Sequence, residues 1–285
     1  MKAKLEDIPT EKGNSSFYAY RFQVPFFEFK WHYHPEYELT YIVNGSGYRI
    51  VGNSYEYFSS GDLVLLGSNV PHTWTSKLQD GVPSESVVIQ FSKEFIASFL
   101  SLNESKSINS MLATSERGIG FAIDEALSSK IIAVTETTGM NRVLKLIALL
   151  DELSQKPMNC IAPNAFHTIV SQKSEVRINK VCLFIQNNFH HKIALKEVAN
   201  LIHVTESNFC KFFKKATGKT YSDYINEIRI NEACRLLAQS EKTINQIAFE
   251  CGFETLSYFN RVFLSKKEVT PSKYRSKTLD RTSKK

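Results

Sequence analysis

The stretch INQIAFECGFETLSYFNRVF (residues 244–263) determines how the C-terminal part of this chain folds. Apolar residues recur at helical spacing in its first positions, and a second helical run with an aromatic seam at Phe259 and Phe263 follows a short turn. Gly252 falls in that turn, where glycine readily adopts a positive φ. A short helix, a tight turn and a second helix form a helix-turn-helix unit.

The same pattern occurs earlier in the chain. Residues 195–199 (LKEVA) correspond to the start of the quoted stretch, and they too are followed by a turn and an aromatic seam. Ala199 and Ala248 are 49 positions apart, whereas Phe209 and Phe259 are 50 positions apart, so the second copy has one extra residue in its turn. The chain therefore contains two helix-turn-helix units.

Two local patterns support this organisation. Residues 221–238, between the copies, have the apolar spacing of an amphipathic linking helix. Thr243 and Gln246 have the spacing of a capping box, which predicts the first residue of the second unit's first helix.

Charge is distributed unevenly along the chain. The 285 residues carry a net charge of +6. Residues 174–285 hold 20 Lys and Arg against 11 Asp and Glu, a balance of +9, whereas residues 1–173 hold 15 against 18, a balance of −3. A basic surface attracts polyanions, so the helix-turn-helix part is predicted to bind DNA. The alternative is an all-helical domain with a chance repeat and a solvated basic surface.

Composition excludes several classes of protein. The apolar share of 42% and the charged share of 22% are those of a globular chain. No stretch approaches the roughly 20 consecutive apolar residues of a transmembrane helix, and the N-terminus becomes acidic at Glu6 and Asp7, unlike a secretory signal. The five cysteines contain no CxxC pair, which favours reduced thiols. We expect a cytoplasmic protein.

Residues 17–91 are typical of a β-rich domain. Turn formers separate short apolar runs at residues 26–29, 39–43, 48–51, 63–66 and 86–91. This spacing predicts an antiparallel sandwich or barrel. Residues 93–154 then follow helical spacing, and the broad apolar face of residues 142–150 would either pack against the barrel or form a dimer interface.

The C-terminal half resembles the AraC/XylS family of bacterial transcription regulators. The resemblance covers about residues 176–275 and rests on Ile244-x-x-Ile247-Ala248-x-x-x-Gly252-Phe253, then Ser257-Tyr258-Phe259-x-Arg261-x-Phe263, then Thr270-Pro271-x-x-Tyr274-Arg275. The first unit matches more loosely, from Phe209 to Gly218. The chain departs from the family at Leu264-Ser265, where basic residues are usual, and at Glu268, where glycine is usual.

The resemblance implies that the second helix of each unit enters the major groove and reads successive segments about one helical turn apart. The candidate DNA-reading residues are Ser207, Asn208, Cys210 and Lys211 in the first unit, and Leu256, Ser257, Asn260 and Arg261 in the second. Arg261 is the strongest candidate, because arginine can bind guanine O6 and N7 together. Lys214, Lys215, Lys266 and Lys267 are interpreted as phosphate contacts, which position a protein without reading sequence.

The N-terminal stretch His32-Tyr33-His34-Pro35-Glu36-Tyr37-Glu38 resembles the first motif of the cupin β-barrels, and residues 61–72 resemble the second. In metal-binding cupins, three histidines and a glutamate hold one divalent metal. The corresponding residues here are His32, His34, Glu38 and His72, whose imidazole and carboxylate groups would suit Fe, Mn, Ni or Zn.

Three roles stay open for these four residues: a metal site, direct contact with a small ligand, and a structural hydrogen-bond cluster. Trp31, Tyr41, Trp74 and Phe91 could line an apolar pocket beside them, or belong to the core. We count Trp74 among the candidate ligand-binding residues. No cofactor is required by this interpretation, and a divalent metal in the barrel is an open alternative.

The sequence thus predicts an α+β chain of two domains. Residues 1–155 form a cupin-like, effector-sensing and dimerising domain, residues 156–173 a linker with two prolines, and residues 174–285 an all-α DNA-binding domain. By resemblance, its partners are double-stranded DNA, a small-molecule effector such as a sugar or related metabolite, RNA polymerase and a second copy of the chain. We expect an activator in the bacterial cytoplasm, at the nucleoid when bound to DNA. The rival interpretation is a metal-dependent cupin enzyme, a dioxygenase or isomerase, with an appended DNA-binding domain.

Overall fold

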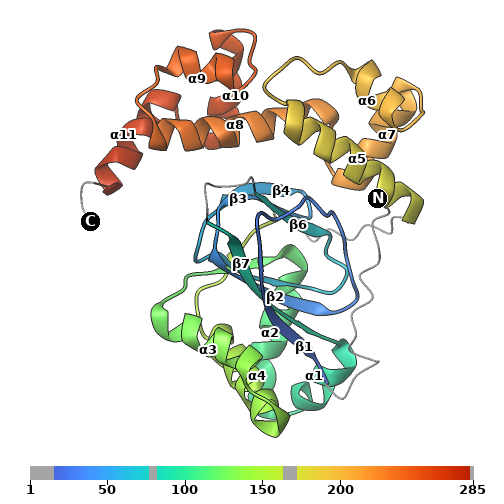
Figure 1. Cartoon of the computed structure of the whole chain (residues 1–285), viewed down its shortest axis with the longest axis vertical. Helices are drawn as coiled ribbons and strands as arrows, with labels where there is room; N and C mark the ends of the chain where they lie inside the picture. The colour runs from blue at the N-terminus through green and yellow to red at the C-terminus, as the bar shows by residue number, and fades with distance from the viewer. Residues whose placement is uncertain (1–15, 77–81, 163–171, 283–285) are drawn as a thin grey trace. The chain divides into compact units, whose positions relative to one another are not determined.

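The structure is a computed structural model that describes residues 16–76, 82–162 and 172–282. The chain divides into two compact units, residues 1–176 and 177–285 (Figure 1). None of the helices within the described residues combines the length and the apolar character needed to cross a bilayer. The two units are described separately below.

The first unit contains two antiparallel sheets. A six-stranded sheet has the order β1-β7-β2-β5-β8-β9, and a three-stranded sheet has the order β4-β3-β6. The strands are β1 (Tyr18–Val24), β2 (Tyr37–Asn44), β3 (Gly47–Val51), β4 (Ser54–Phe58), β5 (Leu63–Leu66), β6 (His72–Ser76), β7 (Ser84–Phe91), β8 (Ile119–Phe121) and β9 (Asn159–Cys160).

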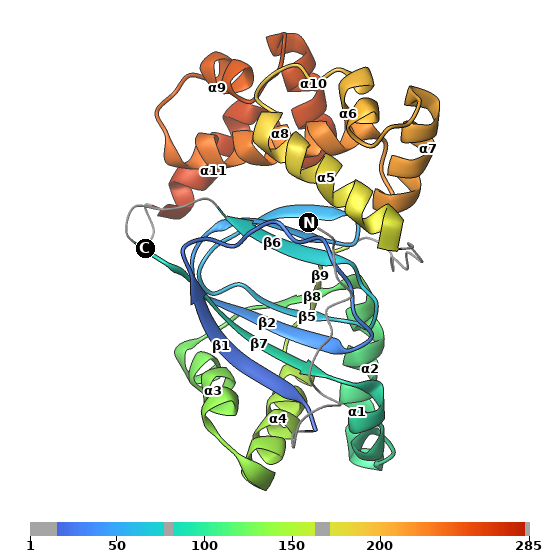
Figure 2. The same cartoon turned by 45° about the vertical axis from the view of Figure 1, so that its right-hand side comes forward.

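The two sheets face each other (Figure 2), and both contribute residues to the lining of one pocket. Within the described residues, their strands do not form one closed hydrogen-bonded barrel. An isolated antiparallel bridge joins His32 to His72, with backbone N–H···O distances of 3.1 and 2.9 Å. The expected β-rich, cupin-like fold is confirmed, as an incompletely closed barrel.

Four helices cover the outer face of the six-stranded sheet: α1 (Lys93–Leu100), α2 (Lys106–Thr114), α3 (Glu125–Glu136) and α4 (Gly139–Ser154) (Figure 2). Alternate residues of the central strands, such as Leu39 and Ile89, point toward these helices and join their apolar faces in one buried core. The intervening residues, such as Thr40 and Val88, point into the space between the sheets. This alternation follows from the two-residue period of a strand.

The apolar face of α4 packs into this core through buried side chains that include Leu146, Leu149 and Leu150. Packing against the sheet therefore accounts for most of that face. Met140 and Leu144 lie on the remaining surface and are 71% and 57% exposed.

One expected strand is wrong. Residues 26–29 form no strand, although Phe27 is buried. Phe27 packs against Phe58, with ring centroids 6.1 Å apart, and its N–H donates to Ser76 Oγ at 2.8 Å. The apolar run therefore anchors an irregular segment by side-chain packing, not by strand pairing.

The second unit is helical. Its helices are α5 (Gln172–Asn188), α6 (Leu195–Leu201), α7 (Glu206–Thr217), α8 (Tyr221–Gln239), α9 (Ile244–Glu250), α10 (Leu256–Lys267) and α11 (Pro271–Thr282) (Figure 1). Helix pairs α6–α7 and α9–α10 are the two helix-turn-helix units, and α8 links them. The stretch expected as a linker, residues 156–173, contains β9 and the start of α5, and residues 163–171 of it lie outside the described residues.

The two turns have the same hydrogen bond. Val204 N–H donates to Ala199 O at 3.1 Å, and Phe253 N–H donates to Ala248 O at 3.0 Å. The residue before each donor has a positive φ, 56° at His203 and 84° at Gly252. Corresponding residues of the two copies are 49 positions apart up to Val204 and Phe253. The helices that follow, α7 and α10, start 50 positions apart. Glu254, between Phe253 and α10, is therefore the extra residue of the second turn.

Gly252 is also required by a close approach. A Cβ atom at this position would lie 2.4 Å from the carbonyl oxygen of Phe189, at the end of α5. The second turn therefore depends on glycine for space as well as for backbone conformation.

The second helices of the two helix-turn-helix pairs, α7 and α10, begin and end in similar ways. Thr205 and Thr255 accept hydrogen bonds from backbone N–H groups of the first turn, at 3.3 and 3.2 Å. Gly218 caps the C-terminus of α7 at φ 71°, and Glu268 caps α10 at φ 58°. The predicted capping box of Thr243 and Gln246 is confirmed.

We predict that Glu268→Gly raises the free energy of unfolding of the helical unit by about 1 kcal/mol, because an L-residue in the left-handed conformation is strained and glycine is not. Urea unfolding followed by helical circular dichroism measures this. Gly218→Ala is the matched control, expected to lower stability by a similar amount. An unchanged or lower midpoint for Glu268→Gly would contradict the strain at this cap.

Candidate functional site

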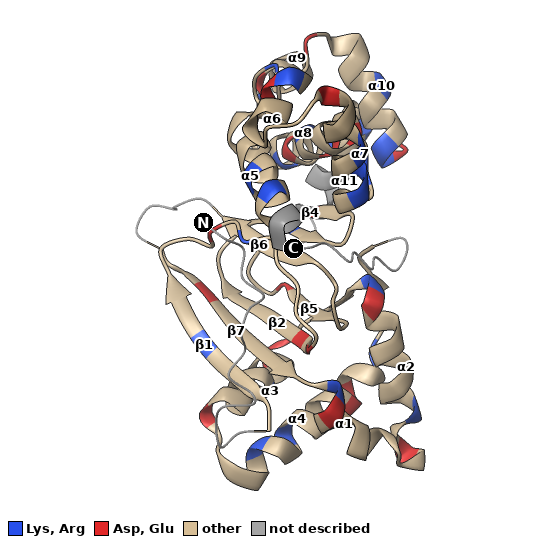
Figure 3. Cartoon of the chain, turned by 90° about the vertical axis from the view of Figure 1, so that its right-hand side faces the viewer, with Lys and Arg blue, Asp and Glu red and all other residues tan. Residues whose placement is uncertain are grey.

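Most candidate DNA-reading side chains are accessible on their helices. Those expected on α7 are all exposed, and on α10 Ser257, Asn260 and Arg261 are exposed. Figure 3 shows Lys and Arg in blue on both helices. Opposite faces of the same helices bury Phe209, Phe213, Phe259 and Phe263. Helices α7 and α10 thus each have one face in the core and one polar face toward solvent.

Three candidate residues on α10 have partners within the unit. Leu256 is half-buried and packs against the apolar core around the second helix-turn-helix pair, α9 and α10. Lys266 forms an ion pair with Asp223 on α8 at 2.8 Å, and Lys267 donates to Asn231 Oδ1 at 2.8 Å. Phosphate contacts predicted for the two lysines would therefore compete with their contacts to α8.

Arg261 is positioned by two residues that sequence reasoning did not include. Its guanidinium carbon lies 5.2 Å from the ring centroid of Tyr258. The hydroxyl of Tyr258 accepts a hydrogen bond from Asn226 Nδ2 on α8 at 2.9 Å. A cation over an aromatic face is attracted to it, so Tyr258 restrains the orientation of Arg261.

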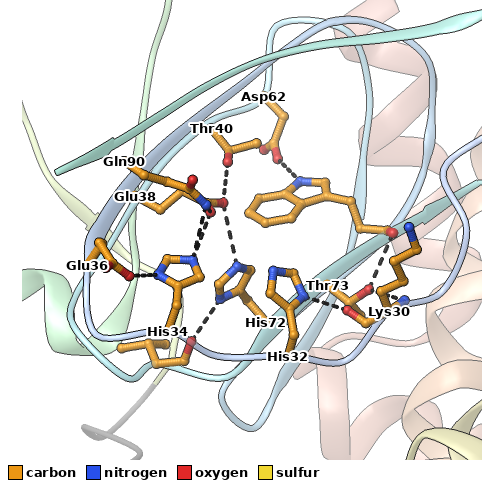
Figure 4. A network of polar contacts seen from close by, with 12 residues as sticks. Lys30, His32, His34, Glu36, Glu38, Thr40, Asp62, His72, Thr73 and Gln90 are labelled. Carbon is orange, nitrogen blue, oxygen red and sulfur yellow. Dashed lines mark hydrogen bonds and ion pairs between the residues drawn. The ribbon is translucent and has the colours of Figure 1, made fainter. Parts of the chain in front are cut away.

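The second group of candidate residues lies between the two sheets. Each of four side chains offers one possible metal-ligand atom, and these atoms all lie within 4.8 Å of one another. The four residues are His32, His34, Glu38 and His72 (Figure 4). The backbone brings them together, since His32 bridges His72 and Glu38 lies on β2 beside them. The structure therefore assembles the four residues predicted from the two motifs.

Glu38 is the centre of the cluster. Its Oε1 accepts a hydrogen bond from Thr40 Oγ1 at 2.5 Å, and its Oε2 accepts one from Gln90 Nε2 at 2.9 Å. His34 Nε2 lies 3.0 Å from Oε2, and His72 Nε2 lies 3.5 Å from Oε1. The carboxylate is thus fixed by β2, β7 and two histidines.

Burial and neighbouring charges shift the pKa values within the cluster. Burial, with a contribution from His72, lowers the pKa of His32 to about 3. Burial opposes protonation of His34, but hydrogen bonds to Glu36 and Glu38 raise its pKa to about 10. Burial would raise the pKa of Glu38, but His72 and His34 hold it well below its usual range. The buried carboxylate is therefore charged at neutral pH.

Sequence reasoning missed Thr40, Gln90 and Glu36. Thr40 is two residues after Glu38 on β2, so it faces the same side of the sheet. Gln90 is the register partner of Glu38 on β7. Strand alternation could have suggested Thr40, but the pairing that brings Gln90 beside Glu38 cannot be read from either strand alone.

A pocket of about 480 Å³ opens beside the cluster. His32, Glu38 and Thr40 lie at its polar end, and most of its remaining wall is apolar or aromatic, including Tyr20, Phe22, Phe26, Phe27, Ile42, Trp74 and Val88. Trp74 therefore lines the pocket as expected. Tyr41 and Phe91 belong to the core beneath the helices.

The comparisons with known proteins agree with this division. Residues 14–118 match the model of an AraC-like ligand binding domain, and residues 198–277 match the model of a helix-turn-helix domain. An uncharacterized HTH-type transcriptional regulator of Staphylococcus aureus (strain MSSA476) is 24% identical over 239 residues, 83% of this chain. The chain spans only 31% of the length of that relative.

Two further relatives are nearer to this chain in length. The uncharacterized HTH-type transcriptional regulator YfiF of Bacillus subtilis (strain 168) is 25% identical over 86% of this chain and 78% of its own length. The HTH-type transcriptional activator RhaS of Mannheimia succiniciproducens is 26% identical over 86% of this chain and 88% of its own length.

We predict that Thr40→Val lowers the free energy of unfolding of the β unit by about 1.5–3 kcal/mol, because a buried carboxylate loses a hydrogen bond. Both tryptophans, Trp31 and Trp74, lie in this unit, so tryptophan fluorescence reports its unfolding specifically. The control is Thr75→Val on β6, in the other sheet of the same unit. Thr75 is half-exposed, so we expect the free energy of unfolding to change by no more than about 0.5 kcal/mol. Equal effects of both substitutions would contradict the assigned role of Thr40.

Proposed function

We propose that the chain is an effector-responsive, sequence-specific DNA-binding regulator of the AraC type, supported by the matches to an AraC-like ligand binding domain and a helix-turn-helix domain. The observation that carries this proposal is the presence of two equivalent helix-turn-helix units, each with a capped helix that exposes one polar face. A site for a small molecule lies in the other unit.

In this proposal α7 and α10 enter successive major-groove segments, where base pairs present a full donor and acceptor code. Residues Ser207, Asn208, Cys210 and Lys211 on α7, and Leu256, Ser257, Asn260 and Arg261 on α10, lie nearest the bases. Lys214, Lys215, Lys266 and Lys267 neutralise phosphates, and the last two exchange their partners on α8 for phosphate on binding.

The pocket between the sheets binds the effector, with Trp74 in its wall and His32, His34, Glu38 and His72 at its polar end. Effector binding shifts the population of conformations that are competent to bind DNA or to activate transcription. Activation is favoured over repression because RhaS, a relative of which the chain covers 88%, is named an activator. The remaining partners in this proposal are RNA polymerase and a second copy of the chain, in the cytoplasm.

A catalytic role of the barrel is the second candidate function, because three histidines and a carboxylate are a ligand set that metal-dependent enzymes also use. The named relatives are transcription regulators. We therefore propose that the cluster binds ligand without turnover.

We predict that Arg261→Ala loses about 1–3 kcal/mol of binding free energy at one base position, because a bidentate contact to guanine is removed. Operators are first selected in vitro from a random DNA library with the full chain. Fluorescence anisotropy on single-base variants of the selected operator then measures the loss.

The matched control is Lys214→Ala, which removes a phosphate contact. It should weaken binding to all operator variants about equally. The slope of the logarithm of the affinity against the logarithm of the salt concentration should become shallower by about one. If Arg261→Ala also weakens binding uniformly across sequences, Arg261 does not read a base. If the full chain selects no preferred sequence, the regulator proposal itself is wrong.

A further inference from the structure

The two helix-turn-helix pairs pack on different halves of α8, the helix that links them (Figure 1). Phe213 of the first pair contacts Tyr221 and Tyr224, with ring centroids 5.9 and 5.3 Å apart. The second pair packs in one core with Ala233 and Leu237, in the other half of the helix. Long helices bend gently, so a bend in the middle of α8 would change the distance between α7 and α10.

Arg229 lies in this middle part of α8 and contacts segments on both sides. Its Nε donates to the carbonyl oxygen of Phe189 at 2.9 Å, and its Nη2 donates to that of His191 at 2.8 Å. Both carbonyl groups belong to the connection from α5 to α6, which leads into the first pair. The guanidinium carbon of Arg229 also lies 5.7 Å from the ring centroid of Phe253, in the turn of the second pair.

Further contacts between the same two segments surround this side chain. His190 Nδ1 lies 3.1 Å from the carbonyl oxygen of Glu250, and Lys192 forms an ion pair with Glu254 at 2.9 Å. The close approach at Gly252 belongs to the same contact. We use the name joint for three parts of the chain together: residues 189–192, Arg229 and residues 250–254.

Capping of α5 does not by itself explain the position of Arg229. The last carbonyl groups of a helix lack partners within the helix, and a cation beside them is stabilising. The hydrogen bonds to Phe189 and His191 are enough for that role. The contact with Phe253 brings in a second element, since a cation is attracted to an aromatic ring, and Phe253 precedes the start of α10 by two residues.

We propose that Arg229 is a positioning residue that sets the spacing of α7 and α10, and with it the separation of the two half-sites that the chain accepts in DNA. Arg229 itself reads no base and acts through the joint. The inference rests on the proposed function in one respect, that α7 and α10 each enter the major groove.

A fixed spacing makes the length of the operator part of its specificity. One extra base pair between the half-sites moves one of them by about 3.4 Å along the duplex and by about 35° around it. A rigid joint cannot follow both changes, so only one separation allows both helices to make their full set of base contacts.

The joint differs from a second connection across α8, which is built from charges. Lys266 on α10 lies 2.8 Å from Asp223 and 3.9 Å from Glu227, and Glu227 also pairs with Lys219, just after α7. In the proposed function Lys266 exchanges these partners for a phosphate. Arg229 is half-buried, and its partners are carbonyl groups and a ring, so the joint is retained when the helical unit binds DNA.

The first experiment measures the spacing of α7 and α10 without DNA. Cys210 and Asn260 are exposed and 50 positions apart, as are Phe209 and Phe259, so they occupy equivalent places on the two helices. Spin labels are attached to Cys210 and, after Asn260→Cys, to position 260 of the full chain. The other exposed thiol is removed by Cys160→Ser, and the remaining three cysteines are buried. Pulsed electron paramagnetic resonance then gives the distribution of distances between the labels.

We expect one narrow distribution for this labelled chain. In the Arg229→Ala variant it should become at least roughly twice as wide, because the two pairs then sample several spacings. Arg235→Ala is the matched control: Arg235 lies on the same helix, and its guanidinium donates to Glu232 and Gln239 of α8 itself. Its removal takes the same charge from α8 and should leave the width unchanged. Equal widths with and without Arg229 overturn the joint.

The second experiment measures the spacing that the chain accepts in DNA. Operators selected with the full parent chain are lengthened or shortened by one base pair between the half-sites, and fluorescence anisotropy measures each affinity. The parent chain should lose roughly tenfold or more in affinity on either change, because base contacts of one half-site are misplaced. Arg229→Ala should bind the selected operator more weakly but lose only roughly threefold or less on either change.

The ratio of these affinities separates positioning from damage to the fold. A variant that is only less stable has fewer active molecules, which weakens its apparent affinity for every operator by the same factor and leaves the ratio unchanged. Arg229→Lys keeps the charge but lacks the planar fork of arginine, so its ratio should be intermediate. A ratio for Arg229→Ala equal to that of the parent chain overturns the proposal.

The two experiments also separate this inference from the proposed function. Operator binding by the parent chain, with the same ratio in every variant, contradicts the role of Arg229 and leaves the regulator proposal in place. Absence of any operator preference in the parent chain contradicts the regulator proposal, and the distances between the labels then decide whether Arg229 fixes the spacing.

Discussion

The buried carboxylate of Glu38 is the contact on which the β unit depends. It receives hydrogen bonds from β2 and β7 and lies against histidines from β6 and from the segment before β2. A buried charge is tolerated only when it is neutralised and hydrogen-bonded. Beside the pocket, this polar cluster contacts both sheets, and apolar clusters such as Phe27, Ile42 and Phe58 join the same sheets elsewhere.

The helical unit is organised by apolar contacts instead. Small or absent side chains at Ala199, Ala248 and Gly252 allow close packing at the two turns, and the buried phenylalanines determine which faces of α7 and α10 are exposed. One unit thus provides a cavity with a charged end, and the other provides two rigid polar surfaces.

The sequence predicted most of what depends on local spacing. The two turns, the capping box and the assembly of His32, His34, Glu38 and His72 follow from residues that lie close together in the chain or in matching motifs. Features that depend on distant partners could not be predicted. The register that places Gln90 beside Glu38, the ion pair of Lys266 with Asp223 and the irregular packing of Phe27 each involve elements far apart in sequence.

The matching caps give α7 and α10 the same length and the same end geometry. Each helix has 12 residues, each begins after a threonine, and each ends at a residue in the left-handed conformation. The odd residue, Glu254, lies before the cap and not within the helix. A segment from Thr205 to Thr220 therefore has the same length and the same end positions as one from Thr255 to Thr270, so the two helices have equal lengths between equivalent caps although their side-chain contacts to the rest of the unit differ.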